Sequence, residues 1–176
     1  MSFLAPSLRT DMSLLDASCG PGSITLELVE MIGQGHVTGI DMAQDDIERA
    51  LELAAQQGVK NIEFQVASVY EIPYPDNTYD AVFLHGMLEH LSEPVKALKE
   101  LRQVLPGGVL GAATPHFSGL LVTPTDHISS GRWICGFGSS VTRAETFSLE
   151  NALDGYCAKQ DTRISRAHHP RSFSPS

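Results

Sequence analysis

The chain has 176 residues, enough for one domain, and its 42% hydrophobic and 19% charged residues are typical of a globular protein. No stretch approaches the roughly 20 apolar residues of a membrane span, and the first ten residues lack the parts of a secretory signal. The part up to Ile128 holds 17 acidic and 6 basic residues. Because the phosphates of nucleic acids require clustered Lys and Arg, this balance argues against a nucleic-acid partner and favours a small molecule.

The first predicted element is a short buried strand that ends at Asp16 and runs into a glycine-rich turn. Leu14 and Leu15 precede the carboxylate, and Gly20 and Gly22 follow it, before a segment with the apolar spacing of a helix. Glycine adopts positive φ and lets the backbone approach a ligand, and the start of the helix presents unpaired N–H groups. A carboxylate at the strand end accepts hydrogen bonds from a cationic group. The stretch therefore predicts a ligand-binding strand–loop–helix corner.

Predicted strands and helices then alternate along the chain. The further predicted strands cover residues 36–40, 61–66, 79–84 and 109–113. One predicted helix stops at Gly58, and its apolar face carries Ile47, Leu51, Ala54 and Ala55. The next predicted helix begins near Pro94, and its apolar face carries Val95, Leu98, Leu101 and Leu105. This alternation predicts βαβ units. The predicted fold class is α/β, with a Rossmann-like, mainly parallel sheet and helices on both faces.

The pattern fails from about Ser129 onward. Glycines and paired serines interrupt any period there, and residues 165–176 are polar, which predicts a disordered end. Only residues 146–156 have the spacing of a helix. The predicted organisation is therefore a core over residues 1–128 and an irregular segment over 129–176.

Two runs of sequence carry a resemblance to a known family. The run from Leu14 to Thr25, LLDASCGPGSIT, resembles the first motif of class I S-adenosylmethionine-dependent methyltransferases. The run from Ile72 to Asp80, IPYPDNTYD, is similar to the L-P-F-x-D-x-x-F-D segment of the ubiquinone/menaquinone-type methyltransferases (methyltransferase domain 11/25 type). The resemblance covers about residues 14–114. It implies S-adenosylmethionine as the cofactor and methyl transfer to a small-molecule acceptor.

The same resemblance implies which residues contact the cofactor. They are Asp16, Cys19, Gly20, Gly22, Asp41, Met42, Ser68, Val69 and His85. In the family, the first acid contacts the amino group of the methionine moiety. The acid at position 41 binds the ribose hydroxyls, and the apolar residue after it packs on adenine. Asp41 also suits a helix N-cap. Ser68 stands where the family often has an acid, and it is equally a turn residue.

Histidine and cysteine offer few candidates for chemistry. His85 and His116 follow predicted strands at the edge where ligands of open α/β sheets bind, so they are the candidate general bases. A lone histidine is more often structural, and His90 is expected to pack or to cap the next helix. The three cysteines and seven histidines have no metal-ligand spacing, which predicts no metal site. Reduced thiols and a cytoplasmic location follow as expectations.

Two alternative functions stay open at this point. About a dozen residues precede the first strand and no closing antiparallel strand pair is predicted after Ser129, so we expect a chain shortened at both ends relative to the family. The fifth strand would then expose an edge that favours self-association, and the chain would suit a catalytically inactive binding protein of the same fold. A nicotinamide-dependent oxidoreductase is the weaker alternative, because its G-x-G-x-x-G loop requires glycine where Thr25 stands.

Overall fold

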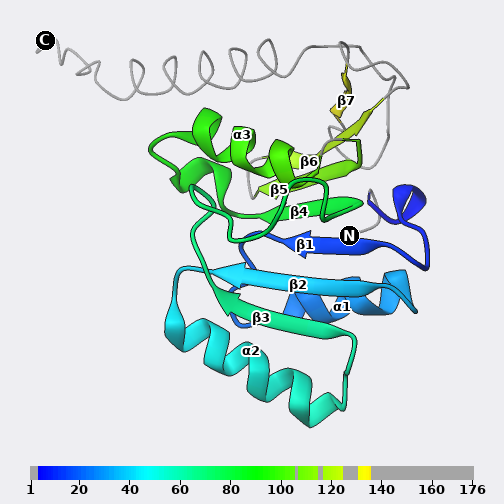
Figure 1. Cartoon of the computed structure of the whole chain (residues 1–176), viewed down its shortest axis with the longest axis vertical. Helices are drawn as coiled ribbons and strands as arrows, with labels where there is room; N and C mark the ends of the chain where they lie inside the picture. Colours follow the sequence, from blue (N-terminus) through cyan, green and yellow to red (C-terminus); the bar gives the residue numbers. More distant parts are fainter. Residues whose placement is uncertain (1–3, 106, 115–116, 125–130, 136–176) are drawn as a thin grey trace, which may run out of the picture.

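The protein forms one sheet of seven strands flanked by helices (Figure 1). The computed structural model describes residues 4–105, 107–114, 117–124 and 131–135. The strands are β1 (Ser13–Asp16), β2 (His36–Asp41), β3 (Ile62–Val66), β4 (Ala81–His85), β5 (Val109–Thr114), β6 (Phe117–Pro124) and β7 (Gly131–Cys135). The helices are α1 (Ser23–Ile32), α2 (Gln44–Gln57) and α3 (Pro94–Val104), with 3-10 turns η1 (Ala5–Ser7) and η2 (Leu88–His90). No described helix has the length and apolar character needed to cross a membrane.

The strand order β3-β2-β1-β4-β5-β6-β7 confirms the predicted Rossmann-like topology. Strands β1 to β5 pair in parallel with their neighbours. The chain moves outward from β1 to β3 and then returns to place β4 on the other side of β1. This reversal makes the carboxyl ends of β1 and β4 the topological switch point, where open α/β sheets bind their ligands.

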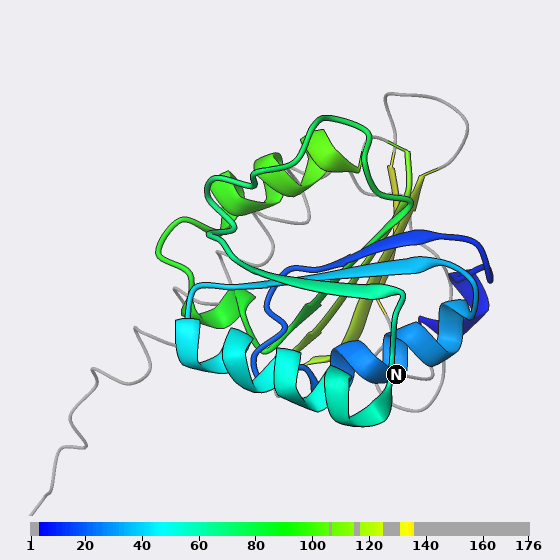
Figure 2. The same ribbon diagram turned by 60° about the horizontal axis from the view of Figure 1, so that its bottom comes forward.

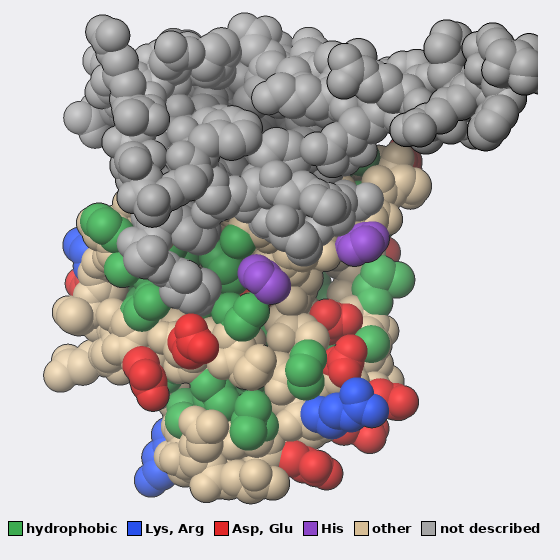
Figure 3. Space-filling view, turned by 180° about the vertical axis from the view of Figure 1, so that it is seen from behind, with side chains coloured by type: hydrophobic (Ala, Val, Ile, Leu, Met, Phe, Trp, Pro, Cys, Tyr) green, Lys and Arg blue, Asp and Glu red, His purple; other side chains and the backbone are tan. Residues whose placement is uncertain are grey.

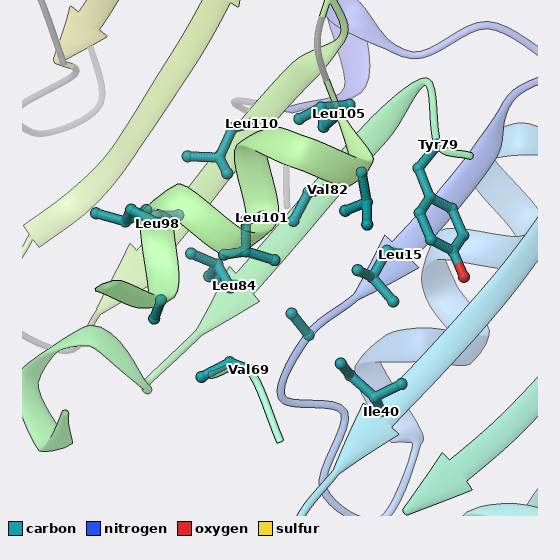
Figure 4. Close-up of a cluster of buried hydrophobic side chains, with 14 of the residues drawn as sticks. Leu15, Ile40, Val69, Tyr79, Val82, Leu84, Leu98, Leu101, Leu105 and Leu110 are labelled. Atoms are coloured by element: carbon teal, nitrogen blue, oxygen red, sulfur yellow. The ribbon is translucent and has the colours of Figure 1, made fainter. Parts of the chain in front are cut away.

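Helices cover both faces of the sheet, as predicted. Figure 2 shows α1 and α2 on one face and α3 on the other. Alternate residues of each strand point to opposite faces, so Leu14 and Phe83 pack with α1, whereas Leu15 and Val82 pack with α3. Figure 4 shows the α3 side of this core, where Leu101 of the helix lies over the sheet. The two cores hold the strands, and thereby their carboxyl ends, in a fixed register.

The buried faces of α2 and α3 differ in detail from the prediction. Helix α2 buries Ile47, Ala50 and Ala54, whereas Leu51 is 49% exposed. Ala50 takes one of these positions because α2 packs closely against the start of α1, where Gly22 lies. In α3, Val95 is exposed, and the buried residues are Ala97, Leu98, Leu101 and Val104. Hydrophobic periodicity thus located both helices and misplaced part of each face.

The expectation that the closing antiparallel strand pair is missing is wrong. Strand β6 pairs antiparallel with β5, and β7 pairs antiparallel with β6. The edge of β5 is therefore covered, which removes the basis for self-association through that edge. Strand hydrogen bonds come from the backbone, so pairing with a neighbour defines these two strands although the sequence over 117–135 has no clear alternating signal. The predicted helix over 146–156 and the predicted disordered end lie outside the described residues.

Candidate functional site

The loop after β1 crosses the carboxyl edge of the sheet at the switch point. The amide of Ala17 donates to the carbonyl of Phe83 in β4 at 2.9 Å, and the amide of Cys19 donates to the carbonyl of Ile40 in β2 at 3.1 Å. The loop is therefore fixed to the strands on both sides of β1. It leads into α1, so the corner predicted from the glycine-rich motif is present.

Asp16 is a buried carboxylate with one unused oxygen. The residue is 1% exposed at the end of β1. Its Oδ2 accepts a hydrogen bond from Thr25 Oγ1 at 2.8 Å, whereas its Oδ1 has no partner among the described residues. Burial raises the pKa of Asp16 to about 6, against the opposing effects of the Thr25 hydroxyl and the Ser18 amide. A buried oxygen of this kind is an acceptor that a cationic ligand would satisfy.

Asp41 is engaged by the protein itself. Its Oδ2 accepts the amide of Gly20 and its Oδ1 accepts the amide of Ala43, both at 3.0 Å. Ala43 is the N-cap of α2, so Asp41 precedes the cap and does not form it. Each carboxylate oxygen has a second lone pair, which leaves capacity to accept two hydroxyl groups. Beside it, the apolar side chain of Met42 is 70% exposed.

The two glycines of the loop have the predicted positive φ, with different surroundings. Gly20 has φ +50°, and a Cβ built there meets no atom within 4 Å. Gly22 has φ +82°, and a Cβ there would lie 2.8 Å from the Cβ of Ala50 in α2. Gly20 thus leaves open space at the edge of the sheet, whereas Gly22 allows α1 and α2 to pack closely.

Cys19 directly precedes Gly20 in the loop and is not a reactive thiol. It is 6% exposed, and burial, reinforced by the charges of Asp16 and Asp41, raises the pKa of the thiol far above its ordinary value. The side chain therefore stays neutral and contributes a small apolar surface under the loop.

Ser68 and Val69 form a tight turn after β3. The Ser68 hydroxyl accepts the amide of Tyr70 at 3.2 Å, and Ser68 forms an isolated bridge with Glu71, so it is a turn residue. The Val69 side chain is buried in the core under α3, as Figure 4 shows. The Ser68 O–H is still able to donate a hydrogen bond to a ligand.

Of the three histidines considered from the sequence, the structure describes His85 and His90. His85 is exposed at the end of β4, with its ring stacked on Phe83 at 6.3 Å between centroids. His90 is exposed and the N-cap of α3 is Glu93, so His90 neither packs nor caps that helix as was expected. His116 lies outside the described residues. Within the described part of the chain, no group of three or more His, Cys, Asp or Glu residues is placed to hold a metal ion.

Sequence reasoning missed two polar partners in this loop. Thr25 fixes one oxygen of Asp16, and the Ser18 hydroxyl bonds the backbone of His85. A hydroxyl in the first turn of the helix beyond a strand-end acid was the available signal for Thr25.

On the face in Figure 3, acidic side chains are spread over the described surface and no wide basic patch interrupts them.

Comparison with known proteins gives a consistent result. A family model described as a methyltransferase domain matches residues 8–131. An uncharacterized methyltransferase of Schizosaccharomyces pombe is 41% identical over 107 residues, covering 57% of this chain and 38% of that protein. The demethylmenaquinone methyltransferase of Listeria monocytogenes is 32% identical over 100 residues, covering 56% of this chain and 42% of that protein.

A solved structure agrees with these relatives. The crystal structure of an S-adenosylmethionine-dependent methyltransferase from Aquifex aeolicus matches with a TM-score of 0.59 and 33% identity, covering 63% of this chain and 60% of that one. The chain spans about two fifths of the length of the curated relatives it matches.

Proposed function

This chain belongs to the S-adenosylmethionine-dependent methyltransferase family, and we propose that it transfers the methyl group of S-adenosylmethionine to a small-molecule acceptor. The observation that carries the proposal is the unpaired Oδ1 of Asp16, buried at the switch point of the sheet. Methionine-derived cofactors present an ammonium group, which is the partner that this oxygen lacks.

The residues around Asp16 fit the remaining parts of the cofactor. The open space at Gly20 suits close approach of the methionine moiety to the backbone. The spare lone pairs of Asp41 suit the two ribose hydroxyls, and the exposed Met42 beside it suits the face of adenine. The Ser68 hydroxyl, in the turn after β3, is a candidate donor to a ring nitrogen of adenine.

The bound cofactor would supply an electrophilic methyl group on a sulfonium. The protein then contributes mainly proximity and alignment of the acceptor with that methyl group. Asp16 and Asp41 hold the donor, and the exposed His85 lies at the same edge. An acceptor that is already nucleophilic needs no base, whereas a protonated hydroxyl or amine acceptor needs one, and His85 is the described candidate for that role.

Calorimetric titration tests the cofactor first. We expect S-adenosylhomocysteine to bind in the micromolar range and NAD not to bind, because Asp16 suits an ammonium group and not a pyrophosphate. The Asp16→Asn variant should lose this binding, and Asp76→Asn, which changes an exposed carboxylate in the loop before β4, should keep it. Binding of NAD in preference to S-adenosylhomocysteine would support the oxidoreductase alternative instead.

A methyl-transfer assay then separates an enzyme from a cofactor-binding protein. Small molecules with hydroxyl, amine, thiol and enol nucleophiles are incubated with S-adenosylmethionine that carries a labelled methyl group. Label that enters an acceptor with the wild-type chain and not with Asp16→Asn supports the proposal. A chain that binds the cofactor and labels no acceptor matches the inactive binding protein.

A further inference from the structure

The segment from Ala17 to Gly20 is hydrogen-bonded first to β4 and then to β2, the two strands that flank β1. Its first amide donates to the carbonyl of Phe83 in β4 at 2.9 Å. Its last two amides donate to β2, one to the carbonyl of Ile40 at 3.1 Å and one to Oδ2 of Asp41 at 3.0 Å. The segment therefore joins β2 to β4 across the end of β1, where the proposed cofactor would lie.

Ser18 supplies the side-chain contact of this segment with β4. Its Oγ donates to the carbonyl of His85 at 3.1 Å and accepts the amide of His85 at 3.3 Å. The β1–β4 ladder ends with Asp16 opposite Phe83. Ser18 and His85 are the residues that would stand opposite each other two positions further on. In a continued parallel ladder, the amide and carbonyl of His85 would bond the backbone of residues 17 and 19, on either side of Ser18. The Ser18 hydroxyl takes both of these roles.

This substitution of a side chain for the backbone has a geometric consequence. A continued ladder would keep residues 17 and 18 in the plane of the sheet. With its hydroxyl on β4, Ser18 leaves its own backbone free to turn toward the glycine-rich loop, while His85 keeps a fixed partner. On its other side, this end of β4 is paired with β5, where His85 lies opposite Ala113, so Ser18 supplies the contact that holds it on the β1 side.

We propose that Ser18 is a positioning residue, whose hydroxyl fixes the carboxyl end of β4, with His85, against the cofactor loop. The proposal deepens the proposed function and rests on it for the identity of the ligand. Asp16 provides the charge and Asp41 the hydroxyl acceptors, whereas Ser18 sets the separation between the loop and the strand that carries His85. Preorganising the loop lowers the cost of ordering it when the ligand binds.

Amide exchange in the ligand-free protein tests the Ser18–His85 contact directly. Loss of one hydrogen bond in Ser18→Ala should speed exchange of the His85 amide by about 3- to 10-fold, measured by NMR. The neighbouring Gly86 amide donates to the carbonyl of Ala113 at 2.8 Å and should not change. Ser18→Thr keeps a hydroxyl and should restore slow exchange. Ser7→Ala is the matched control, because the Ser7 hydroxyl makes no hydrogen bond within the described residues.

Affinity for S-adenosylhomocysteine tests whether this contact serves the site. Ser18→Ala should bind it about 3- to 10-fold more weakly, and Ser18→Thr and Ser7→Ala should bind it as wild type does. Unchanged His85 exchange in Ser18→Ala overturns the proposal, and so does a threonine variant that behaves like the alanine variant. A wild-type chain that does not bind the ligand overturns the proposed function, and the exchange rates still decide whether Ser18 holds β4.

Discussion

Replacement of Asp16 by asparagine should change the pH dependence of the unfolding free energy and, as a separate effect, remove ligand binding. Burial raises the pKa of Asp16 to about 6 from its ordinary value of 3.8. Ionising the carboxylate in the folded protein is therefore unfavourable by about 3 kcal/mol relative to the unfolded chain. A carboxyl group with a raised folded pKa stabilises the protonated fold, and this stability is lost as the pH rises through the interval between the two pKa values.

The pH dependence isolates this charge from other effects of the substitution. Asparagine keeps an oxygen for the Thr25 hydroxyl and carries no charge, and its buried amide has a cost that does not vary with pH. Between about pH 4.5 and pH 7.5, the wild-type protein should lose about 2 kcal/mol relative to Asp16→Asn. Urea unfolding at several pH values measures this difference, which corresponds to a relative melting shift of about 4–8 °C.

Near pH 7.5, ligand should stabilise the wild-type protein and not Asp16→Asn. S-adenosylhomocysteine at about 100 times its Kd would stabilise the wild-type protein by about 2.7 kcal/mol and leave Asp16→Asn unchanged. The control Asp76→Asn, at an exposed position, should follow wild type in both series. A stability difference that stays constant with pH would refute the buried charge at Asp16. Wild-type affinity in a folded Asp16→Asn would remove this carboxylate from the site.

Three further substitutions test the roles assigned to other residues. Asp41→Ala removes an acceptor shared by two backbone amides and the proposed ribose hydroxyls. Calorimetry should therefore show at least about 30-fold weaker binding of S-adenosylhomocysteine. Equal affinity would exclude the ribose role. Gly20→Val should stay folded and lose binding of S-adenosylhomocysteine. Gly22→Ala should lose about 2–4 kcal/mol of unfolding free energy, because its Cβ meets Ala50. The reverse outcome would contradict the assignment of Gly20 to the ligand and of Gly22 to helix packing. Asn61→Ala removes two hydrogen bonds to carbonyls between α1 and β2, so it should lower the unfolding free energy by about 1–2 kcal/mol at unchanged affinity.

The parallel part of the fold was predictable because its signals are local. Buried parallel strands read as short apolar runs, and Gly58 ends α2 with φ +67°, as a helix-stopping glycine does. The antiparallel strands β6 and β7 were not predicted, because backbone pairing with a neighbour defines them and the sequence between residues 117 and 135 has no clear period. The exposed Leu51 shows a similar limit, since the identity of the facing surface decides which side of a helix is buried.

The site was predictable as a set of positions and less so as a set of roles. The spacing of Asp16, Gly20 and Asp41 placed them at one edge of the sheet, because strand ends in a parallel sheet meet there. The sequence did not distinguish a glycine that leaves space for a ligand from one that leaves space for a helix. It also did not show that Ser18 bonds His85, because that contact joins residues 67 positions apart.

The two acids at this edge have opposite local environments, and this difference assigns their contributions to binding. Asp41 already has an amide on each oxygen, so a ligand adds hydrogen bonds to a carboxylate that is stable without it. Asp16 is buried with one oxygen unpaired, so its ionised form carries a cost in the fold that protonation or a cationic partner relieves. We therefore propose that Asp16 selects for a positive charge, whereas Asp41 accepts the Gly20 amide and so holds the loop that would receive the ligand. In the proposed function both acids contact the donor, so selection of a methyl acceptor would come from other residues.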